Sequence, residues 1–276
     1  MRLRTILRFL GAAVLCAHIA SAQAVLLQIR PHIGDTLRMH LSQSVEMTGT
    51  THNGGRDSTS SMTTSIEVFS RAIAEQWTPG GTLMQTITDS VAMNPASAAS
   101  LDDLRRRALQ SKRVWLRVSP DGAMEVVHES DPTSDLQEIF GGMPAMLARQ
   151  AVNVGEKWTR EMQIPLSGDP GAMGAVRATF RLDSLSRNGD IAYVSLRGTM
   201  ARVIPPNAPA PAGYTTSGTL VGTIQIDRRL GWITDSRSSI IVRSTIASTA
   251  RRGEPQRSPM QVRTKITQWI RAMRAR

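Results

Sequence analysis

Apolar and polar residues alternate with a period of two along most of the chain, a pattern typical of β-strands with one buried face. The clearest run is residues 37–47, whose apolar side consists of Leu37, Met39, Leu41, Val45 and Met47. Arginine, histidine, serine and glutamate occupy the other side of this run. Similar runs recur as far as residue 270 and predict about ten strands, most of them antiparallel to their sequence neighbours.

Short turn signals separate these runs. Residues 119–122 (Ser-Pro-Asp-Gly) and 188–189 (Asn-Gly) each stand between two alternating segments, as do residues 78–81 and 227–231. Proline presets one turn dihedral and glycine accepts a positive φ, so these sequences favour tight hairpin turns. The phase of the alternation slips near residues 69–73, which predicts a β-bulge there.

Two stretches have helical periodicity instead. Residues 100–111 place Leu101, Leu104 and Ala108 on one face. Residues 134–150 present a longer apolar face, which the glycine pair at 141–142 and Pro144 should kink or divide. That face consists of Leu136, Ile139, Phe140, Met143, Met146 and Leu147. The chain therefore predicts an α+β fold, mainly β: a large, curved, half-barrel-like antiparallel sheet with two short helical elements packed on one face.

The N-terminus has the composition of a secretory signal. Three arginines precede an apolar run at residues 9–20, and residues 20–22 (Ala-Ser-Ala) match the small-x-small pattern that signal peptidase reads. We therefore predict that residues 1–22 are a signal peptide and that residues 23–276 form a single β-rich domain, exported to the periplasm or beyond. Retention of the segment as an uncleaved membrane anchor is the alternative.

The only cysteine, Cys16, lies inside this segment. The bulky Leu15 directly before it fits a lipoprotein signal poorly, so a lipid anchor is not expected. Cleavage would leave a chain without cysteine, which excludes disulfides, thiolate metal sites and a cysteine nucleophile. The roughly 250 residues that remain are enough to bury a core without disulfide staples.

The chain is basic, with 33 Lys and Arg against 22 Asp and Glu and a formal net charge of +11. In a cytosolic protein this excess of positive charge would suggest that nucleic acid is the binding partner. Because we predict export, we do not expect this protein to bind nucleic acid. Two interpretations remain open. The basic residues form either a solvated surface or a surface that contacts anionic lipid or glycan at the cell envelope.

Candidate catalytic or metal-binding groups are sparse. The histidines beyond the signal are His32, His40, His52 and His128, and none has a second ligand at metal-binding spacing. The sequence also lacks the Gly-x-Ser-x-Gly and Ser-x-x-Lys motifs of nucleophilic enzymes. We therefore expect no enzyme activity, cofactor or metal, while a hydrolase whose carboxylates meet only in the fold stays a weaker alternative.

A short motif occurs twice. Residues 33–37 (Ile-Gly-Asp-Thr-Leu) and 154–158 (Val-Gly-Glu-Lys-Trp) both read apolar-Gly-acid-x-large apolar, and both precede an alternating run. The repeat indicates either a duplicated β unit, with halves at residues 24–130 and 150–272, or two ordinary turns that each begin a strand. Its structural residues are Gly34, Gly155 and Trp158.

The second copy of the motif also carries a family resemblance. Together with the glycine-punctuated strands at residues 217–227 and the Gly-Trp pair at 231–232, it resembles a family of uncharacterised bacterial envelope proteins, exported or lipid-anchored. The resemblance covers most of residues 25–270, and it transfers no catalytic residue because the family has no established function. The broader architecture resembles the lipoprotein-carrier type, in which short helices close the concave side of a curved sheet that commonly binds acyl chains.

Three hypotheses for function follow. The first is a non-catalytic exported envelope protein that binds a lipid, another apolar or amphiphilic ligand, or an envelope partner. The apolar face at residues 136–147 would then cover the ligand as a lid. The second is a structural or interaction module with a filled core and no ligand, and the third is a hydrolase that acts on an envelope polymer. The sequence does not indicate an oligomeric state.

Overall fold

The computed structural model describes residues 24–53, 56–94, 113–129, 144–165, 173–203, 214–246 and 259–275. Within these ranges the chain forms eleven strands and no helix. The strands are β1 (Thr36–Asn53), β2 (Arg56–Thr78), β3 (Gly81–Asn94), β4 (Arg113–Val118), β5 (Met124–Glu129), β6 (Lys157–Pro165), β7 (Met173–Leu185), β8 (Ile191–Val203), β9 (Tyr214–Asp227), β10 (Trp232–Ile246) and β11 (Met260–Arg274). The predicted signal peptide and the helix predicted at residues 100–111 lie outside the described residues.

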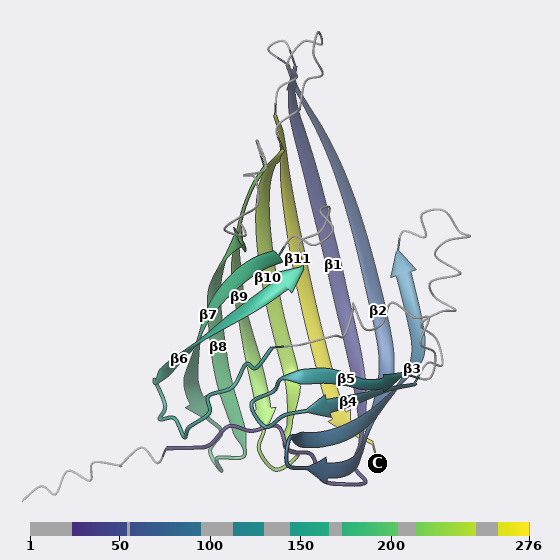
Figure 1. Ribbon diagram of the computed structural model, residues 1–276, viewed down its shortest axis with the longest axis vertical. Helices are drawn as coiled ribbons and strands as arrows, with labels where there is room; N and C mark the ends of the chain where they lie inside the picture. The colour runs from purple at the N-terminus through teal and green to yellow at the C-terminus, as the bar shows by residue number, and fades with distance from the viewer. Residues whose placement is uncertain are drawn as a thin grey trace, which may run out of the picture.

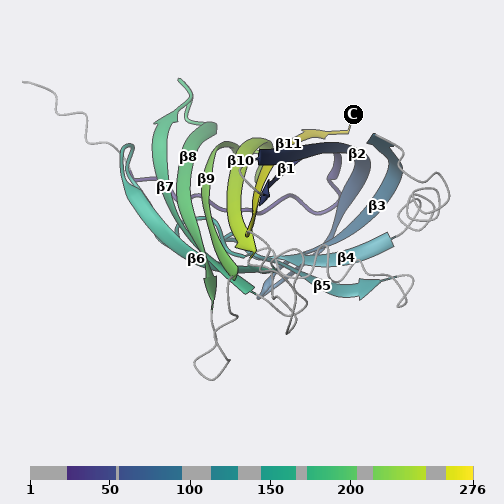
Figure 2. The same ribbon diagram turned by 90° about the horizontal axis from the view of Figure 1, so that it is seen from above.

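All eleven strands belong to one antiparallel sheet (Figure 1). Its order is β5-β4-β3-β2-β1-β11-β10-β9-β8-β7-β6, so the first and last strands pair in the middle and each flank is a series of hairpin neighbours. Seen from above, the sheet curves round into a deep trough (Figure 2). The mainly β, curved antiparallel part of the prediction is therefore confirmed, with eleven strands instead of about ten.

The hairpin turns lie where the turn signals predict them. Residues 78–81, 119–122, 188–189 and 227–231 join β2 to β3, β4 to β5, β7 to β8 and β9 to β10. The predicted bulge also forms, as a register shift between β2 and β3 at Phe69 and Ser70. Both signals are local, because a tight turn and the strands beside it are specified by neighbouring residues.

The N-terminal stretch, residues 24–35, crosses the lower end of the trough as an extended strap (Figure 1). Its side chains Leu27 and Ile29 are almost completely buried. Its backbone bonds to four separate parts of the fold: Val25 pairs with Val152, and the N–H groups of Ile29, Arg30 and Gly34 donate to the carbonyls of Pro120, Gly231 and Ala74 at 2.9, 2.8 and 2.8 Å. The strap therefore closes the lower end of the trough.

Residues 144–152 close the lower end on another side, between the β4–β5 turn and β6. The N–H groups of Met146 and Leu147 both donate to the carbonyl of Asp121, at 2.9 Å each. Residues 144–150 are irregular, so the helix predicted over 134–150 is wrong for this part, while 134–143 lie outside the described residues. Proline opposes a helix here, and the Asp121 carbonyl takes N–H groups that a helix would otherwise use. The α+β class is thus replaced by all-β for the described residues.

The repeated motif has one conformation in both copies. Gly34 and Gly155 have φ angles of 86° and 88°. The Gly34 N–H donates to the carbonyl of Ala74, and the Ala74 N–H donates to the carbonyl of Asp35. Gly155 and Glu156 make the same pair of bonds with Leu182, in the same sense. The two turns dock alike, while the duplication of residues 24–130 and 150–272 stays a prediction.

The hydrophobic core lies between the concave face of the sheet, the strap and residues 144–152, and it extends along β7 and β8 as far as Val176 and Met200. Its completely or almost completely buried side chains include Leu27, Leu37, Leu147, Phe180, Leu182 and Ile226. Phe180 stacks on Trp158, with ring centroids 5.7 Å apart, and the Trp158 Nε1–H donates to the carbonyl of Met146 at 2.8 Å. Trp158 of the motif therefore fastens residues 144–152 to β6.

The outer face of the sheet is mainly polar. Ion pairs such as Arg71 with Asp89 and Lys265 with Glu46 lie on it, exposed to solvent. Trp269 lies between the guanidinium groups of Arg237 and Arg271, at 4.8 and 3.9 Å from its ring centroid. Serine, threonine and arginine fill most other outward positions of β8 to β11. Such a face is typical of an antiparallel sheet with one side in water.

Candidate functional site

On β1, β2 and β9 to β11, the upper part of the concave face is an apolar wall whose side chains are only half-buried. Leu220 and Val242 pack against the core, which places this face on the concave side. We call this surface the inner wall. It consists of Leu41, Gln43 and Val45 on β1, Ile66 and Val68 on β2, Leu220 on β9, Ser238, Ile240 and Val242 on β10, and Ile266, Gln268 and Ile270 on β11.

Four strands place apolar side chains opposite one another in one row of the inner wall. Val45 lies opposite Ile266, Ile266 opposite Ile240, and Ile240 opposite Leu220. Directly opposite residues have Cβ atoms roughly 5 Å apart, so the row is continuous. Complete burial of such a side chain stabilises by roughly 1.5–3 kcal/mol relative to exposure. Because these side chains are half-buried, part of that free energy is available to a ligand that covers them.

An ion pair fastens the strap to the last strand at the lower end. Arg274 Nη2 donates to Asp35 Oδ1 at 2.5 Å, and the Asp35 side chain is only 3% exposed. His32 Nδ1 lies 3.6 Å from the other carboxylate oxygen. Because a buried carboxylate without its partner is costly, this contact holds the strap against β11.

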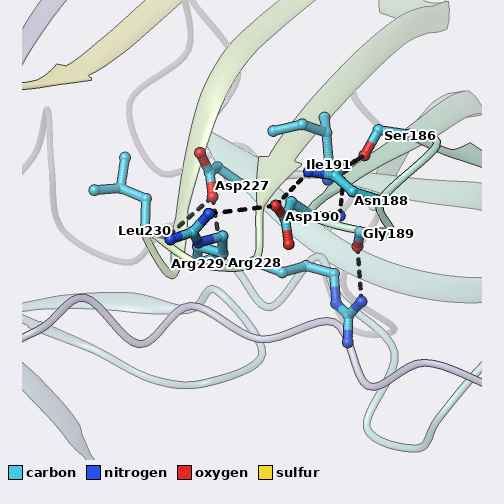
Figure 3. A network of polar contacts seen from close by, with 9 residues as sticks. All are labelled: Ser186, Asn188, Gly189, Asp190, Ile191, Asp227, Arg228, Arg229 and Leu230. Carbon is cyan, nitrogen blue, oxygen red and sulfur yellow. Dashed lines mark hydrogen bonds and ion pairs between the residues drawn. The ribbon is translucent and has the colours of Figure 1, made fainter.

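A polar network links the β7–β8 and β9–β10 turns (Figure 3). Asp227 Oδ1 accepts from the backbone N–H groups of Arg229 and Leu230 at 2.9 Å each. Arg228 Nη1 donates to the carbonyl of Gly189 at 2.8 Å, and Arg229 Nη1 lies 3.7 Å from Asp190 Oδ2. These bonds hold the turn whose Gly231 carbonyl accepts from the strap, so the network's role is structural.

Asp121 fastens residues 144–152 through its side chain as well as its carbonyl. Its carboxylate accepts from Ser119 Oγ at 2.6 Å and lies 3.6 Å from Arg149 Nε. Burial by itself raises the pKa of Asp121, but hydrogen bonds from Ser119 and the Ala123 backbone and the charges of Arg160 and Arg149 outweigh it. The pKa of Asp121 is therefore lowered, and its ionised form stabilises the closure.

An open pocket of about 1090 Å³ borders the strap, the β9–β10 turn and the end of β11. Its lining includes Arg30, Arg228, Arg229 and Arg274. The Arg30 guanidinium lies 5.0 Å from the ring centroid of Trp77, another lining residue whose side chain is half exposed. Guanidinium groups around an open pocket provide a place for an anionic group.

The predicted lid face falls largely outside the described residues. Leu136, Ile139, Phe140 and Met143 are not among them, so their role stays a prediction. Leu147 is completely buried in the core, and Met146 is half-buried against it. These two residues therefore help to close the lower end of the trough.

The histidines are dispersed over the described part of the chain. His40 stacks on Phe69 on the outer face, with ring centroids 4.3 Å apart, and His128 lies 5.1 Å from the Trp115 ring. His52 pairs with Asp57 at the β1–β2 tip, which is remote from His32 on the strap. Over the described ranges, no cluster of potential ligands could hold a metal ion, and no helix has the length and apolar character needed to cross a membrane.

The inner wall was missed as a candidate site. Its signal lies in the run at residues 37–47, where Gln43 interrupts an otherwise apolar side. The strand at residues 260–270 has a similar interruption at Gln268. Only the pairing of β1 with β11 brings the two glutamines together, because they are far apart in sequence.

Comparisons with known proteins find a match to a family of unknown function. A family of unknown function (DUF6263) matches residues 121–233, a range that contains the motif at 154–158 and the strands at 217–227. The resemblance to a family of unknown function is confirmed over this range. No curated protein matches the chain.

Two solved structures resemble the chain weakly. An outer membrane channel from Pseudomonas putida F1 has 13% sequence identity and a TM-score of 0.23, with 92% of this chain and 98% of that chain covered. The outer membrane protein OprG from Pseudomonas aeruginosa has 7% identity and a TM-score of 0.11, with 89% and 99% covered. With TM-scores this low, neither likeness says what this chain does.

Proposed function

We propose that this protein is a non-catalytic, exported envelope protein that binds the apolar part of an amphiphile along its inner wall. The observation that carries the proposal is the set of half-buried apolar side chains on the concave side of the sheet. A module with a filled core packs such positions to the density of a protein interior and leaves little apolar surface half open. The alternative of a structural module is therefore less well supported.

The choice of residues on the inward and outward sides of the strands supports the same proposal. Strands whose outer side faces hydrocarbon carry apolar residues outward. Here Ile240 and Ile266 point inward, while Arg243, Arg263 and Lys265 lie on the outward side of the same two strands. This polarity favours an apolar ligand inside the trough and water outside it.

Export is part of the proposal and rests on the signal pattern at residues 1–22. N-terminal sequencing of the protein from a periplasmic extract should begin at Gln23. Full-length protein retained in the cytoplasm would contradict export, without bearing on the inner wall.

A second candidate function is suggested by the arginine-lined pocket beside the strap. We propose that these arginines contact an anionic lipid surface, which the basic net charge would favour. Arg30→Ala should weaken sedimentation with phosphatidylglycerol vesicles at low salt, and phosphatidylcholine vesicles should not bind in either case. Equal binding by the variant and the unmodified protein would reject this role.

The inner wall is tested by two adjacent isoleucines that face opposite sides of β10. Ile240 lies opposite Ile266 and Leu220 on the wall, whereas Ile241 lies opposite Lys265 and Thr219 on the outer face. Ile240→Arg should weaken binding of the neutral fluorescent probe N-phenylnaphthylamine at least about tenfold, because the probe would then have to desolvate a charge. Ile241→Arg is the matched control and should change the affinity less than about twofold.

Two outcomes would contradict the proposal. The first is a wild-type protein that neither binds the probe nor yields extractable lipid after purification from the periplasm. The second is equal loss of binding in both arginine variants, which would place the probe elsewhere. Thermal melts of both variants should confirm that each is folded before the affinities are compared.

A further inference from the structure

We infer that Gln43 and Gln268 recognise a neutral hydrogen-bonding group, such as an ester or amide, in the ligand of the inner wall. The inference rests on the proposed function and specifies the class of amphiphile. The two glutamines lie directly opposite each other on β1 and β11, and Ser238 lies opposite Gln268 on β10. They form one polar row across three central strands.

Apolar rows flank this polar row. On one side lie Val45, Ile266 and Ile240, and on the other lie Leu41 and Ile270. Neither β1 nor β11 has a register shift in this region, so the glutamines share the concave face with these residues. The polar row therefore lies partway along an apolar path, where it would meet the middle of a bound amphiphile.

The polar side chains of this row have no protein partner within the described part of the chain. No hydrogen bond or ion pair involves the side chains of Gln43, Gln268 or Ser238 there. Each is half-buried, so water can reach it while the wall is open. The hydrogen-bonding groups of these three side chains are therefore available to a ligand.

Covering the wall with hydrocarbon would remove this water. A buried amide without a hydrogen-bond partner is unfavourable, so a purely hydrocarbon ligand is penalised at this row. A glutamine amide offers two N–H donors and a carbonyl acceptor, which match an ester or amide carbonyl and a hydroxyl. A neutral group is favoured because the row carries no charge to compensate for desolvation of an ion.

The test compares two probes on two forms of the protein. Monopalmitoylglycerol carries an ester and hydroxyls beside its acyl chain, whereas N-phenylnaphthylamine lacks such an ester. Gln43→Leu/Gln268→Leu should weaken monopalmitoylglycerol binding about tenfold and leave N-phenylnaphthylamine binding equal or tighter. Gln261→Leu, an exposed outward glutamine of β11, is the matched control and should change neither affinity.

The outcomes separate this inference from the proposed function. If the double variant retains the wild-type preference for monopalmitoylglycerol, the inference that the glutamines recognise the ester is wrong. The proposal that the inner wall binds an apolar ligand would be unaffected. If the wild-type protein binds neither probe, the proposed function itself fails. Probe binding by the double variant also shows that its wall is folded, so a loss confined to monopalmitoylglycerol reports recognition.

Discussion

The lower and upper halves of the sheet share strands and alternation but differ in what covers them. On β9, Ile226 in the lower half is fully buried, whereas Leu220 in the upper half is only half-buried, although both point to the concave side. The strap and residues 144–152 make their backbone hydrogen bonds at the lower end, where Ile226 lies. Alternation therefore determines which face a side chain occupies, and a separate cover determines whether it is buried.

The upper half keeps its shape through its backbone ladder. β1 has 18 residues and β2 has 23, against roughly 5–6 for an ordinary strand. β1 pairs with β11 from Leu37 to Thr50 without a register shift. The long ladders carry the half-buried wall beyond the core, so a binding surface can persist where packing contributes little to stability.

The largest expected effect comes from making the same truncation in both halves. Leu182→Ala removes a completely buried side chain of the core and should lower the free energy of unfolding by about 2–5 kcal/mol. Leu220→Ala, on the half-open wall, should cost less than half as much, because solvent already reaches that site. Urea denaturation of both variants measures the difference, and equal losses would show that the two halves are packed alike.

The strap provides the next largest effect. Gly231 has a φ of 63°, and a Cβ there would lie 2.1 Å from the carbonyl oxygen of Arg30. Gly231→Ala should therefore destabilise by about 2–4 kcal/mol, from backbone strain plus displacement of the strap. Gly155→Ala carries similar strain with open space around its Cβ, and should cost about 1–2 kcal/mol. If both variants lower the free energy of unfolding by the same amount, the clash between residue 231 and the strap contributes nothing to the loss.

Local signals account for what the sequence could predict. The hairpins at residues 119–122 and 188–189 and the bulge near residue 69 follow from turn chemistry and alternation within single segments. The strap could not be predicted, because residues 24–35 are extended without a partner strand and bury Leu27 and Ile29 against distant turns. A short extended segment has no periodicity that distinguishes a cover from a loop.

The candidate site could not be predicted from the sequence for a related reason. Gln43 and Gln268 become neighbours only through the pairing of the first and last strands. The apolar spacing at residues 134–150 instead suggested a helical cover. Residues 146 and 147 do point to the core as that spacing implied, but the carbonyl of Asp121 binds their N–H groups and leaves them irregular. Long-range hydrogen bonding overrode local propensity at this position.

The smallest expected effect concerns how Asp121 contributes to closure of the lower half. Its pKa is lowered in the folded protein, so the unfolded chain binds more protons near that pKa and stability rises with pH there. The contribution is therefore present above the ordinary aspartate value of about 4 and is lost as the pH falls through the lowered pKa. Asp121→Asn should lower the free energy of unfolding by less than about 1 kcal/mol at neutral pH, since solvent screens this partly exposed group.

Urea denaturation at a series of pH values tests this contribution. The difference in stability between wild type and Asp121→Asn should begin to shrink below about pH 4 and approach zero only once the pH lies below the lowered pKa of Asp121, because both side chains are then neutral in the folded protein. A difference that stays constant with pH would mean that the asparagine disturbs packing and that the charge contributes nothing. Probe binding at neutral pH should be unchanged in this variant, because Asp121 closes the lower half and the inner wall lies in the upper half. Loss of binding with little loss of stability would instead show that the two halves are coupled.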